Sequence, residues 1–355
     1  MARFIQFHLL TTYGPSNPNR DDQGRPKQAV VGGAPRLRIS SQSIKRALRE
    51  SSFFELDLKG HLGTRTKRLH EQLVADQTAK GVDAVAAAQA ADTVAEIFGK
   101  LEKVGQKDDE RSVATTLAFI SPAEWALAGE LMDKVLSGDD LPKEKDLKKL
   151  VLRKADGAVD IAMFGRMLAA DADFNREAAV QVAHAITTHR AQAEEDWFAA
   201  VDDLNKADDT GAGHLGETAF GSGVYYQYVC VNTDLLVENL GGDRELAAKG
   251  GEALAKALPM VTPTGKQNSF AHRPRAFYML AEKGNQAPRD LSGAFFEAVR
   301  TLPLADTSVK ALEKTRADID AAYGKCFDDD CKMHIGQEGT LEDIVSFIRN
   351  AILEA

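Results

Sequence analysis

The sequence predicts a mixed α+β fold in which a helical block interrupts a sheet-forming core. Apolar and polar residues alternate near the N-terminus, around residue 184 and around residue 228, and this period of two predicts strands. Between the first two of these segments, residues 59–178 are rich in Ala and in helix-start signals. We therefore expect a core of strands and helices with one large helical insertion.

The first fifty residues predict a strand followed by a short helix. Residues 3–11 alternate, and the Gly and Pro residues between 14 and 24 predict an irregular loop. Ser40 and the three residues after it supply N-cap hydroxyl groups for a helix that starts near residue 41. Ile44, Ala47 and Leu48 stand at the spacing of a buried helix face.

The insertion predicts several helices. Residues 70–101 read as a helix that ends near Gly99. Ser121, Pro122 and Glu124 form a helix start with a capping box. Residues 113–120 fit either a short strand or a helix. A further helix is predicted over 141–154.

Strand signals return after residue 157. Residues 159–163, 180–188 and 224–231 alternate, and in the second of these His184 falls on the apolar face, as a core histidine would. The remaining predicted elements are a helix over 244–258, a loop over 262–275, a strand over 276–280, and helices over 291–300, 308–323 and 340–353. Without the insertion, the order is strand, helix, strand, strand, helix, strand, which is typical of a ferredoxin-like or RNA-recognition-motif domain.

The net charge of −9 is unevenly distributed. Residues 1–50 carry nine Lys and Arg against three acidic residues, or +6, and the other 305 residues carry −15. Such an asymmetry is typical of a local site for a polyanion. No apolar run is long enough to span a membrane and no secretory signal is present, so we expect a cytoplasmic protein.

The densest basic cluster follows Ser40. Backbone N–H groups at a helix start, combined with several cationic side chains, suit a phosphate backbone. Arg36 and Arg38 would point the same way in an extended segment. The alternative is a solvated helix face, which is the usual role of a charge run. The cluster consists of Lys45, Arg46 and Arg49.

Trp197 and Phe198 form an aromatic pair among acidic residues, ahead of a Gly-rich stretch that suits a hairpin. Exposed aromatic side chains on a polar segment can stack on a base or wedge between bases. The alternative is that this pair anchors the segment onto the core.

Two groups of residues raise the question of metal binding. Adjacent Asp21 and Asp22 could hold a divalent cation, although a turn with local ion pairs is the simpler interpretation. Cys326, Cys331 and His334 supply three ligands with acidic residues between them, which favours a solvated loop. Motifs for phosphate loops, dinucleotides, zinc proteases and nucleophile elbows are missing from the sequence, so no cofactor is expected.

Several strings of residues carry a family resemblance. The densest are 19–22, 32–33 and 36–47, and later strings follow in order at 159–167, 183–189, 196–204, 214–224 and 238–242. Together they resemble the backbone subunit of type I-E CRISPR Cascade (CasC, Cas-seven family), a RAMP-type crRNA-binding protein.

The resemblance implies a structural RNA-binding protein rather than an enzyme. Its implied shape is a right hand with an RNA-recognition-motif palm, helical fingers and a β-hairpin thumb. Several copies would polymerise along a CRISPR RNA as a helical filament, and each thumb would displace a base of the RNA held by its neighbour. The guide RNA would pair with a target DNA strand. The other implied partners are Cascade subunits: a 5′-handle cap, a 3′-hairpin-binding processing endonuclease, and the small and large subunits.

The resemblance also implies boundaries and site residues. The palm would comprise 1–58, 179–190 and 224–355, the fingers 59–178 and the thumb 191–223. The implied RNA contacts are Arg20, Arg38, Ser40, Gln42, Lys45, Arg46, Arg49, Arg166, Met167 and Lys266. The implied thumb residues at the displaced base are Trp197, Phe198, Val201 and Leu215. No catalytic or metal-binding residue is implied.

A different function stays open at this point. Some related filament subunits of other CRISPR types cut RNA. The alternative is therefore a metal-dependent RNA endonuclease subunit that uses Asp21 or Asp22.

Overall fold

A computed structural model describes residues 3–105, 111–152, 157–168, 172–200 and 214–354. The chain divides into two compact units. Unit 1 comprises Met1–Phe54, Gln181–Val231 and Gly251–Ala355, and unit 2 comprises Glu55–Val180 and Asn232–Gly250. Residues 232–250 thus belong to unit 2, whereas the sequence prediction places them in the palm.

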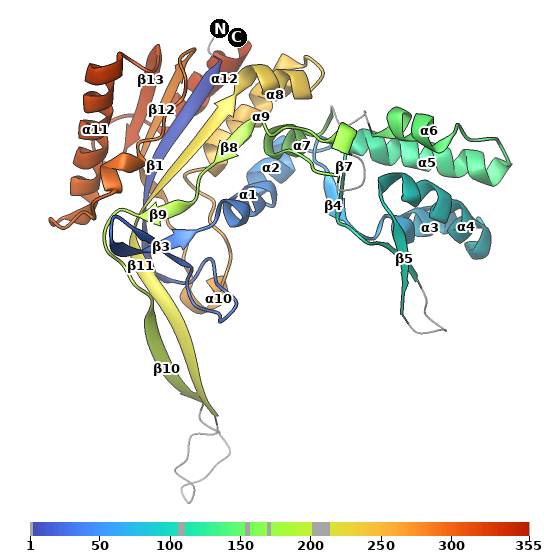
Figure 1. The fold of residues 1–355 in the computed structure, drawn as a ribbon, viewed down its shortest axis with the longest axis horizontal. Helices are drawn as coiled ribbons and strands as arrows, with labels where there is room; N and C mark the ends of the chain where they lie inside the picture. Colours follow the sequence, from blue (N-terminus) through green and yellow to red (C-terminus); the bar gives the residue numbers. More distant parts are fainter. Residues whose placement is uncertain (1–2, 106–110, 153–156, 169–171, 201–213, 355) are drawn as a thin grey trace, which may run out of the picture. The chain divides into compact units, whose positions relative to one another are not determined.

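Unit 1 is built on one large sheet (Figure 1). Its strands are β1 (Phe4–Ser16), β2 (Gln28–Val31), β3 (Ala34–Ile39), β8 (Val180–Val182), β9 (Ala185–Thr187), β10 (Glu194–Ala200), β11 (His214–Asn232), β12 (Ala276–Gly284) and β13 (Asp329–His334). They lie in the order β13-β12-β1-β11-β9-β3-β2, and β8 and β10 also pair with β11. The helices of unit 1 are α1 (Ser41–Arg49), α10 (Gln267–Phe270), η4 (Ser292–Phe295), α11 (Leu304–Tyr323) and α12 (Leu341–Leu353), together with the end of α9 (Arg244–Ala257).

One face of the sheet carries α1 and α12. Ile44 and Leu48, the buried residues of α1, line a small cavity with Tyr225 of β11. Lys283 of β12 pairs with Ile5 of β1, and its ammonium group lies 5.0 Å from the centroid of a Phe ring in α12. Apolar side chains from both helices therefore bury this face.

The opposite face is covered by α11 and by residues around η4. Leu10, Tyr226 and Tyr278 point to this face and pack with Val309 and Leu312 of α11. In Figure 1, α11 runs beside β13 and β12. The sheet therefore has no open face in this region, because both sides are buried.

A polar cluster lies beneath α11. Atom Nε2 of His8 lies 3.3 Å from a Glu282 carboxylate oxygen, and Nδ1 of His8 lies 2.9 Å from the Tyr226 hydroxyl group. Arg289 and Arg316 both donate to the same carboxylate, the latter at 2.8 Å. Burial opposes the charged form of Glu282, but hydrogen bonds from His8 and Arg289 lower its pKa to about 2. Burial lowers the pKa of His8.

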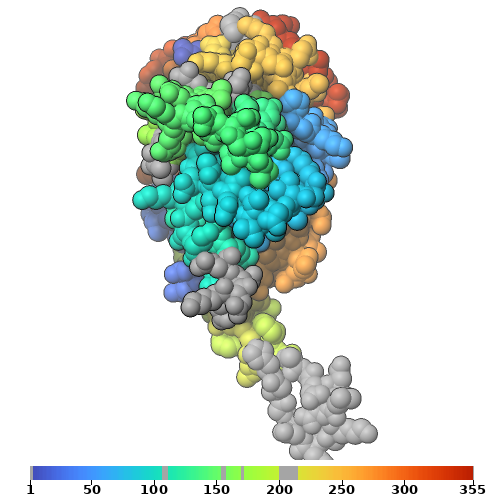
Figure 2. Space-filling model, turned by 90° about the vertical axis from the view of Figure 1, so that its right-hand side faces the viewer, coloured from blue at the N-terminus to red at the C-terminus, as the bar shows by residue number. Residues whose placement is uncertain are grey.

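Unit 2 is mainly helical. Its elements are β4 (Thr64–Thr66), α3 (Leu69–Ala79), α4 (Ala84–Ala95), η1 (Glu96–Phe98), β5 (Leu101–Val104), β6 (Arg111–Ala114), β7 (Ala118–Ile120), α5 (Pro122–Ser137), α6 (Glu144–Val151), α7 (Val159–Phe164), η3 (Ala172–Phe174), α8 (Thr233–Asn239), the second half of α2 (Ser52–Asp57) and the start of α9. Figure 2 shows α3 and α4 beside α5 and α6 on its surface, and their apolar side chains form one core cluster. Every helix among the described residues is too short or too polar to span a membrane.

The predicted helix starts are confirmed where a hydroxyl side chain supplies the cap. The Ser40 hydroxyl accepts the Ser43 N–H at 3.3 Å, and α1 begins at residue 41. Ser121 and Glu124 form the predicted capping box. The single helix predicted over 70–101 is divided, because the Asp83 carboxylate accepts N–H groups at the start of α4 and so opens a new helix.

The strand predicted over 159–163 is wrong, because this segment forms α7. Asp160 and Ala162, which alternate with the apolar residues, are buried as well. The alternation therefore does not indicate a strand with one face exposed to solvent. Asp160 satisfies its carboxylate by accepting the Gly63 N–H at 2.7 Å. Residues 113–120 form parts of two strands, β6 and β7, and 291–300 contain only the short helix η4.

Candidate nucleic-acid interface

Three side chains hold the N-terminus of α1. The Ser40 hydroxyl accepts from Ser43, the Asn19 Oδ1 atom accepts the Ser40 N–H at 2.8 Å, and the His184 Nδ1 atom accepts the Ser41 N–H at 2.9 Å. These donors would otherwise be unsatisfied at a helix start. Ser40, predicted as an RNA contact, is buried and acts as the N-cap, whereas Gln42 in the first turn is exposed.

The basic side chains of α1 divide between two helix faces. Lys45 and Arg49 are four residues apart and share one face. Burial lowers the pKa of Lys45, whose side chain is partly covered. Arg46 lies on the adjacent face, where its Nε atom is 2.9 Å from a Glu50 carboxylate oxygen. Arg46 thus stands beside the face that Lys45 and Arg49 share, as the helical spacing predicts.

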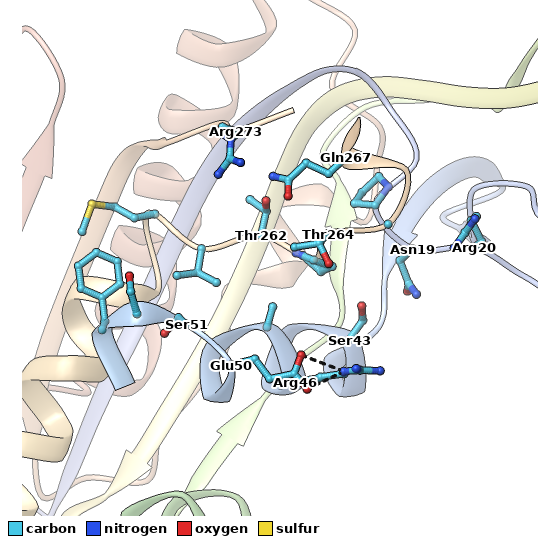
Figure 3. A pocket seen from close by; sticks show the side chains of 18 of the residues that line it. Asn19, Arg20, Ser43, Arg46, Glu50, Ser51, Thr262, Thr264, Gln267 and Arg273 are labelled. Carbon is cyan, nitrogen blue, oxygen red and sulfur yellow. Dashed lines mark hydrogen bonds and ion pairs between the residues drawn. The ribbon is translucent and has the colours of Figure 1, made fainter. Parts of the chain in front are cut away.

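The Arg46 face of α1 borders an open groove of about 920 Å³ in unit 1. Figure 3 shows Arg46 and Glu50 on one side of this groove, with Gln267 and Arg273 on the other. The groove combines four Arg side chains with three carboxylates and several neutral hydrogen-bonding groups. The charged lining residues are Arg20, Arg46, Arg273, Arg275, Asp21, Asp22 and Glu50.

The far side of the groove is a tightly held loop of residues 262–275. Lys266 and Ala271 flank α10 with positive φ angles of 52° and 50°, a conformation that costs free energy for residues other than Gly. The Nε2 atom of His272 lies 2.9 Å from the Pro263 carbonyl oxygen. A side chain at Gly265 would overlap the Pro18 carbonyl, so the loop packs closely against the opposite loop. Lys266 belongs to this loop but is not among the lining residues.

Arg36 and Arg38 have different roles. Arg38 is partly exposed beside the start of α1. Arg36 is fully buried, and its guanidinium donates to the carbonyl oxygens of Thr187 at 2.8 Å and Phe295 at 2.9 Å. The expectation that both point to one cationic surface is wrong, because Arg36 ties β3 to the segment that covers the sheet.

The strands β10 and β11 form a hairpin that projects from the sheet (Figure 1). Trp197 and Leu215 are 69% and 68% exposed, and Phe198 is 47% exposed. Leu215 pairs with Ala199, so it shares a face with Trp197, while Phe198 and Gly216 share the other face. The predicted thumb residues thus lie on two faces. Val201 lies outside the described residues.

The loop of residues 17–27 braces the base of this hairpin. The buried Asn17 amide donates to the carbonyl oxygens of Gly24 at 2.9 Å and Ala219 at 2.8 Å. Arg25 forms an ion pair with Glu195 of β10. The same loop carries Arg20 into the groove, so the loop connects the hairpin to the groove.

Arg166 has a structural role in unit 2. Its guanidinium is buried against the buried Glu124 carboxylate, at 2.7 Å, and also donates to the carbonyl oxygens of Phe119 and Leu152. This position corrects the prediction that Arg166 contacts RNA, because contact would require breaking a buried ion pair. Met167, the next residue, is 81% exposed.

Among the described residues, the two candidate metal groups are not arranged as metal sites. An Asp21 carboxylate oxygen accepts the N–H groups of Gln23 at 3.0 Å and Arg25 at 2.9 Å, which closes a turn. Cys331 and His334 lie on the edge strand β13. Across the described residues, no group of three or more His, Cys, Asp or Glu is arranged to hold a metal ion.

Sequence reasoning missed part of the interface. His184 is exposed beside α1 rather than in the core, because β8 ends at Val182 and β9 begins at Ala185, which breaks the predicted alternation. Arg273 and Arg275 lie in the predicted loop over 262–275, which contains no acidic residue. Their position on the groove depends on contacts far apart in the sequence.

The fold and the groove define an α+β protein with a cationic surface and a projecting hairpin. The chain belongs to the CT1975-like protein family, which matches residues 5–345. Its structure is similar to a chain of a "CRISPR RNA-guided surveillance complex, pre-nicking", with a TM-score of 0.85, 27% identity, and coverage of 99% of this chain and 100% of that chain. A chain of a "CRISPR RNA-guided surveillance complex" has the same fold, with a TM-score of 0.75, 24% identity and coverage of 99% and 100%. No curated protein matches the chain.

Proposed function

We propose that the chain is a non-catalytic, guide-RNA-binding backbone subunit of a CRISPR RNA-guided surveillance complex of type I-E. The observation that carries the proposal is the similarity, at 27% identity, to the whole of a chain from a CRISPR RNA-guided surveillance complex. The type I-E assignment rests on the dense string of residues 36–47, which contains the α1 cap with Lys45 and Arg46.

The chemistry of α1 supports RNA backbone binding. Lys45 and Arg49 offer cations on one face, and the capped helix start adds oriented N–H groups and a positive helix end. Such contacts recognise phosphate and not base identity. The subunit would therefore accept guides of unrelated sequence.

The sheet supports a palm of the RNA-recognition-motif type. The strand order β12-β1-β11-β9, with α1 after β1 and α9 before β12, is the order expected when four strands and two helices alternate in that fold. The β10–β11 hairpin, with Trp197 and Leu215 exposed, is suited to the thumb of a filament subunit that reaches a neighbouring copy. The guide, target DNA strand and other Cascade subunits are the partners that this role requires.

The proposal is tested with the full-length chain and fluorescein-labelled 30-nucleotide RNAs of two unrelated sequences. The double variant Lys45→Glu/Arg49→Glu should bind both RNAs more weakly by at least about ten-fold, and the slope of log K against log salt should fall by about two. The matched control is Lys310→Glu/Lys314→Glu. It makes the same charge change at the same spacing on α11, across the sheet from α1.

Loss of affinity for only one RNA sequence would contradict backbone recognition. Equal losses in the α1 and α11 variants would show that net charge alone drives binding. The number of copies per RNA, measured by the mass of the RNA-bound assembly, tests the filament: one copy per RNA contradicts it.

The endonuclease alternative has less support, since the Asp21 carboxylate already closes its own turn. Incubation of the RNA-loaded chain with complementary RNA and Mg²⁺ separates the two functions. Regularly spaced cleavage that is lost in Asp22→Ala would favour the enzyme over the structural subunit.

A further inference from the structure

His184 occupies an unexpected position beside the helix that we assign to RNA binding. It lies between β8 and β9, is exposed, and accepts the Ser41 N–H through Nδ1 at 2.9 Å. Because a backbone N–H can only donate, Nδ1 carries no proton in this arrangement. The neutral imidazole therefore carries its proton on Nε2, the nitrogen on the other side of the ring.

The charged groups that act on His184 are both cationic. Burial lowers the pKa of His184, and Arg38 and Lys27 lower it further. The exposed Nε2–H donor thus stands beside the positive end of α1, and Arg38 and Lys27 act on the same imidazole, an arrangement that favours an anion.

Each of these groups is held by a separate element. Arg38 stands on β3, and its backbone N–H donates to the Lys27 carbonyl at 2.8 Å. Lys27 donates its own backbone N–H to the Asn19 carbonyl, and the Asn19 side chain caps Ser40. The backbone that carries these side chains is therefore fixed before any ligand arrives, which favours binding.

We propose that His184 is an additional guide-RNA residue, in which Nδ1 fixes the start of α1 and the Nε2–H group donates to an RNA phosphate held with Arg38 and Lys27. The inference rests on the proposed RNA-binding function. It gives the exposed imidazole two roles, one positional and one in direct contact with RNA.

Two substitutions separate these roles. In His184→Asn, the side-chain oxygen can replace Nδ1 as the acceptor for Ser41, but no donor reaches the Nε2 position. In His184→Gln, the longer amide can reach the Nε2 position, but the acceptor for Ser41 is lost. The matched control is His61→Asn, which changes an exposed histidine of unit 2.

The measurement is the affinity of the full-length variants for a fluorescein-labelled 30-nucleotide RNA, together with thermal unfolding. We expect His184→Asn to unfold at the wild-type Tm but bind RNA about ten-fold more weakly, the loss expected for one charge-assisted hydrogen bond. His184→Gln should show the reverse, a lower Tm with affinity closer to that of the wild type.

Wild-type affinity in His184→Asn would overturn the phosphate contact. Parallel losses of affinity and Tm in both variants would leave His184 with a structural role only, which also overturns it. Failure of the wild-type chain itself to bind RNA would instead refute the proposed function, and the inference with it.

Discussion

The ring of Phe198 lies against Gly216 on the neighbouring strand of the β10–β11 hairpin. The two residues are paired across the ladder, and a Cβ atom at Gly216 would overlap the Phe198 ring. The absence of a side chain at residue 216 therefore makes room for the ring. This contact fixes Phe198 on one face of the hairpin and leaves Trp197 on the other.

Replacing Gly216 should disturb the hairpin without unfolding the sheet. Gly216→Val would force the Phe198 ring off its strand, a local overpacking cost of about 1–3 kcal/mol. We expect faster amide hydrogen exchange in β10 and the paired part of β11, with little change in β1. The control is Gly14→Val, where a new Cβ meets no atom within 4 Å. Unchanged exchange in β10 would show that the Phe198–Gly216 contact does not order the hairpin.

Gly265 should control the shape of the groove. A methyl group there would overlap the Pro18 carbonyl, so Gly265→Ala should push residues 262–275 away from the opposite loop. Since this loop carries Arg273 and Arg275, RNA affinity should fall by about three- to ten-fold while Tm changes little. The matched change Gly293→Ala, which has open space, should leave affinity unaltered. Identical RNA affinities for the two variants would show that the shape of the groove does not affect RNA binding.

Arg166 should contribute to stability rather than to RNA binding. Burial raises the pKa of Glu124, which Arg166 counteracts, so Arg166→Met leaves a buried carboxylate without its cation. We expect unfolding to become easier by roughly 3–5 kcal/mol. Adding Glu124→Gln, which keeps the cap on α5, should recover much of this loss. An Arg166→Met variant with wild-type stability but weakened RNA binding would instead support the prediction that Arg166 contacts RNA.

The stability of unit 1 should depend on pH through Glu282. Its pKa is about 2 in the folded chain against an ordinary value of 4.5, so the unfolded chain binds more protons between these values. The stabilisation, roughly 3 kcal/mol, is complete above pH 4.5 and is lost as pH falls toward 2. His8, with its lowered pKa, acts in the same direction below its ordinary value of 6.5.

Hydrogen exchange of β1 and β12 amides between pH 5 and pH 3 measures this effect, after correction for the intrinsic rate. Glu282→Gln should flatten the pH dependence of protection in these two strands. The control Glu102→Gln changes an exposed carboxylate of β5 and should keep the wild-type slope. An unchanged slope in Glu282→Gln would exclude this carboxylate as the source.

Local chemistry predicted the parts of the fold that depend on neighbours in sequence. The caps of α1 and α5 follow from Ser40 and from Ser121 with Glu124, because a cap needs only residues within one turn. The exposed pair Trp197 and Phe198 was also visible, since aromatic residues among acidic ones stand out from a core pattern.

Long-range burial explains what the sequence did not reveal. Arg36 and Arg166 look like surface cations, but each finds buried acceptors more than ten residues away. The helix α7 was mistaken for a strand because tertiary contacts bury its polar Asp160 as well as its apolar residues. His184 lies beside the start of α1 and not in the core. Residues 183 and 184 fall between two short strands, and this break interrupts the predicted alternation.

The cover that α11 places over the sheet limits what this subunit can read. In RNA-recognition motifs, the face away from the helices is where aromatic residues stack on bases. Here Tyr226 and Tyr278 on that face are buried in the core of unit 1. For the proposed function, this means that the sheet cannot recognise the bases of the guide RNA through these two side chains. One polypeptide would then serve guide RNAs of unrelated sequence without change.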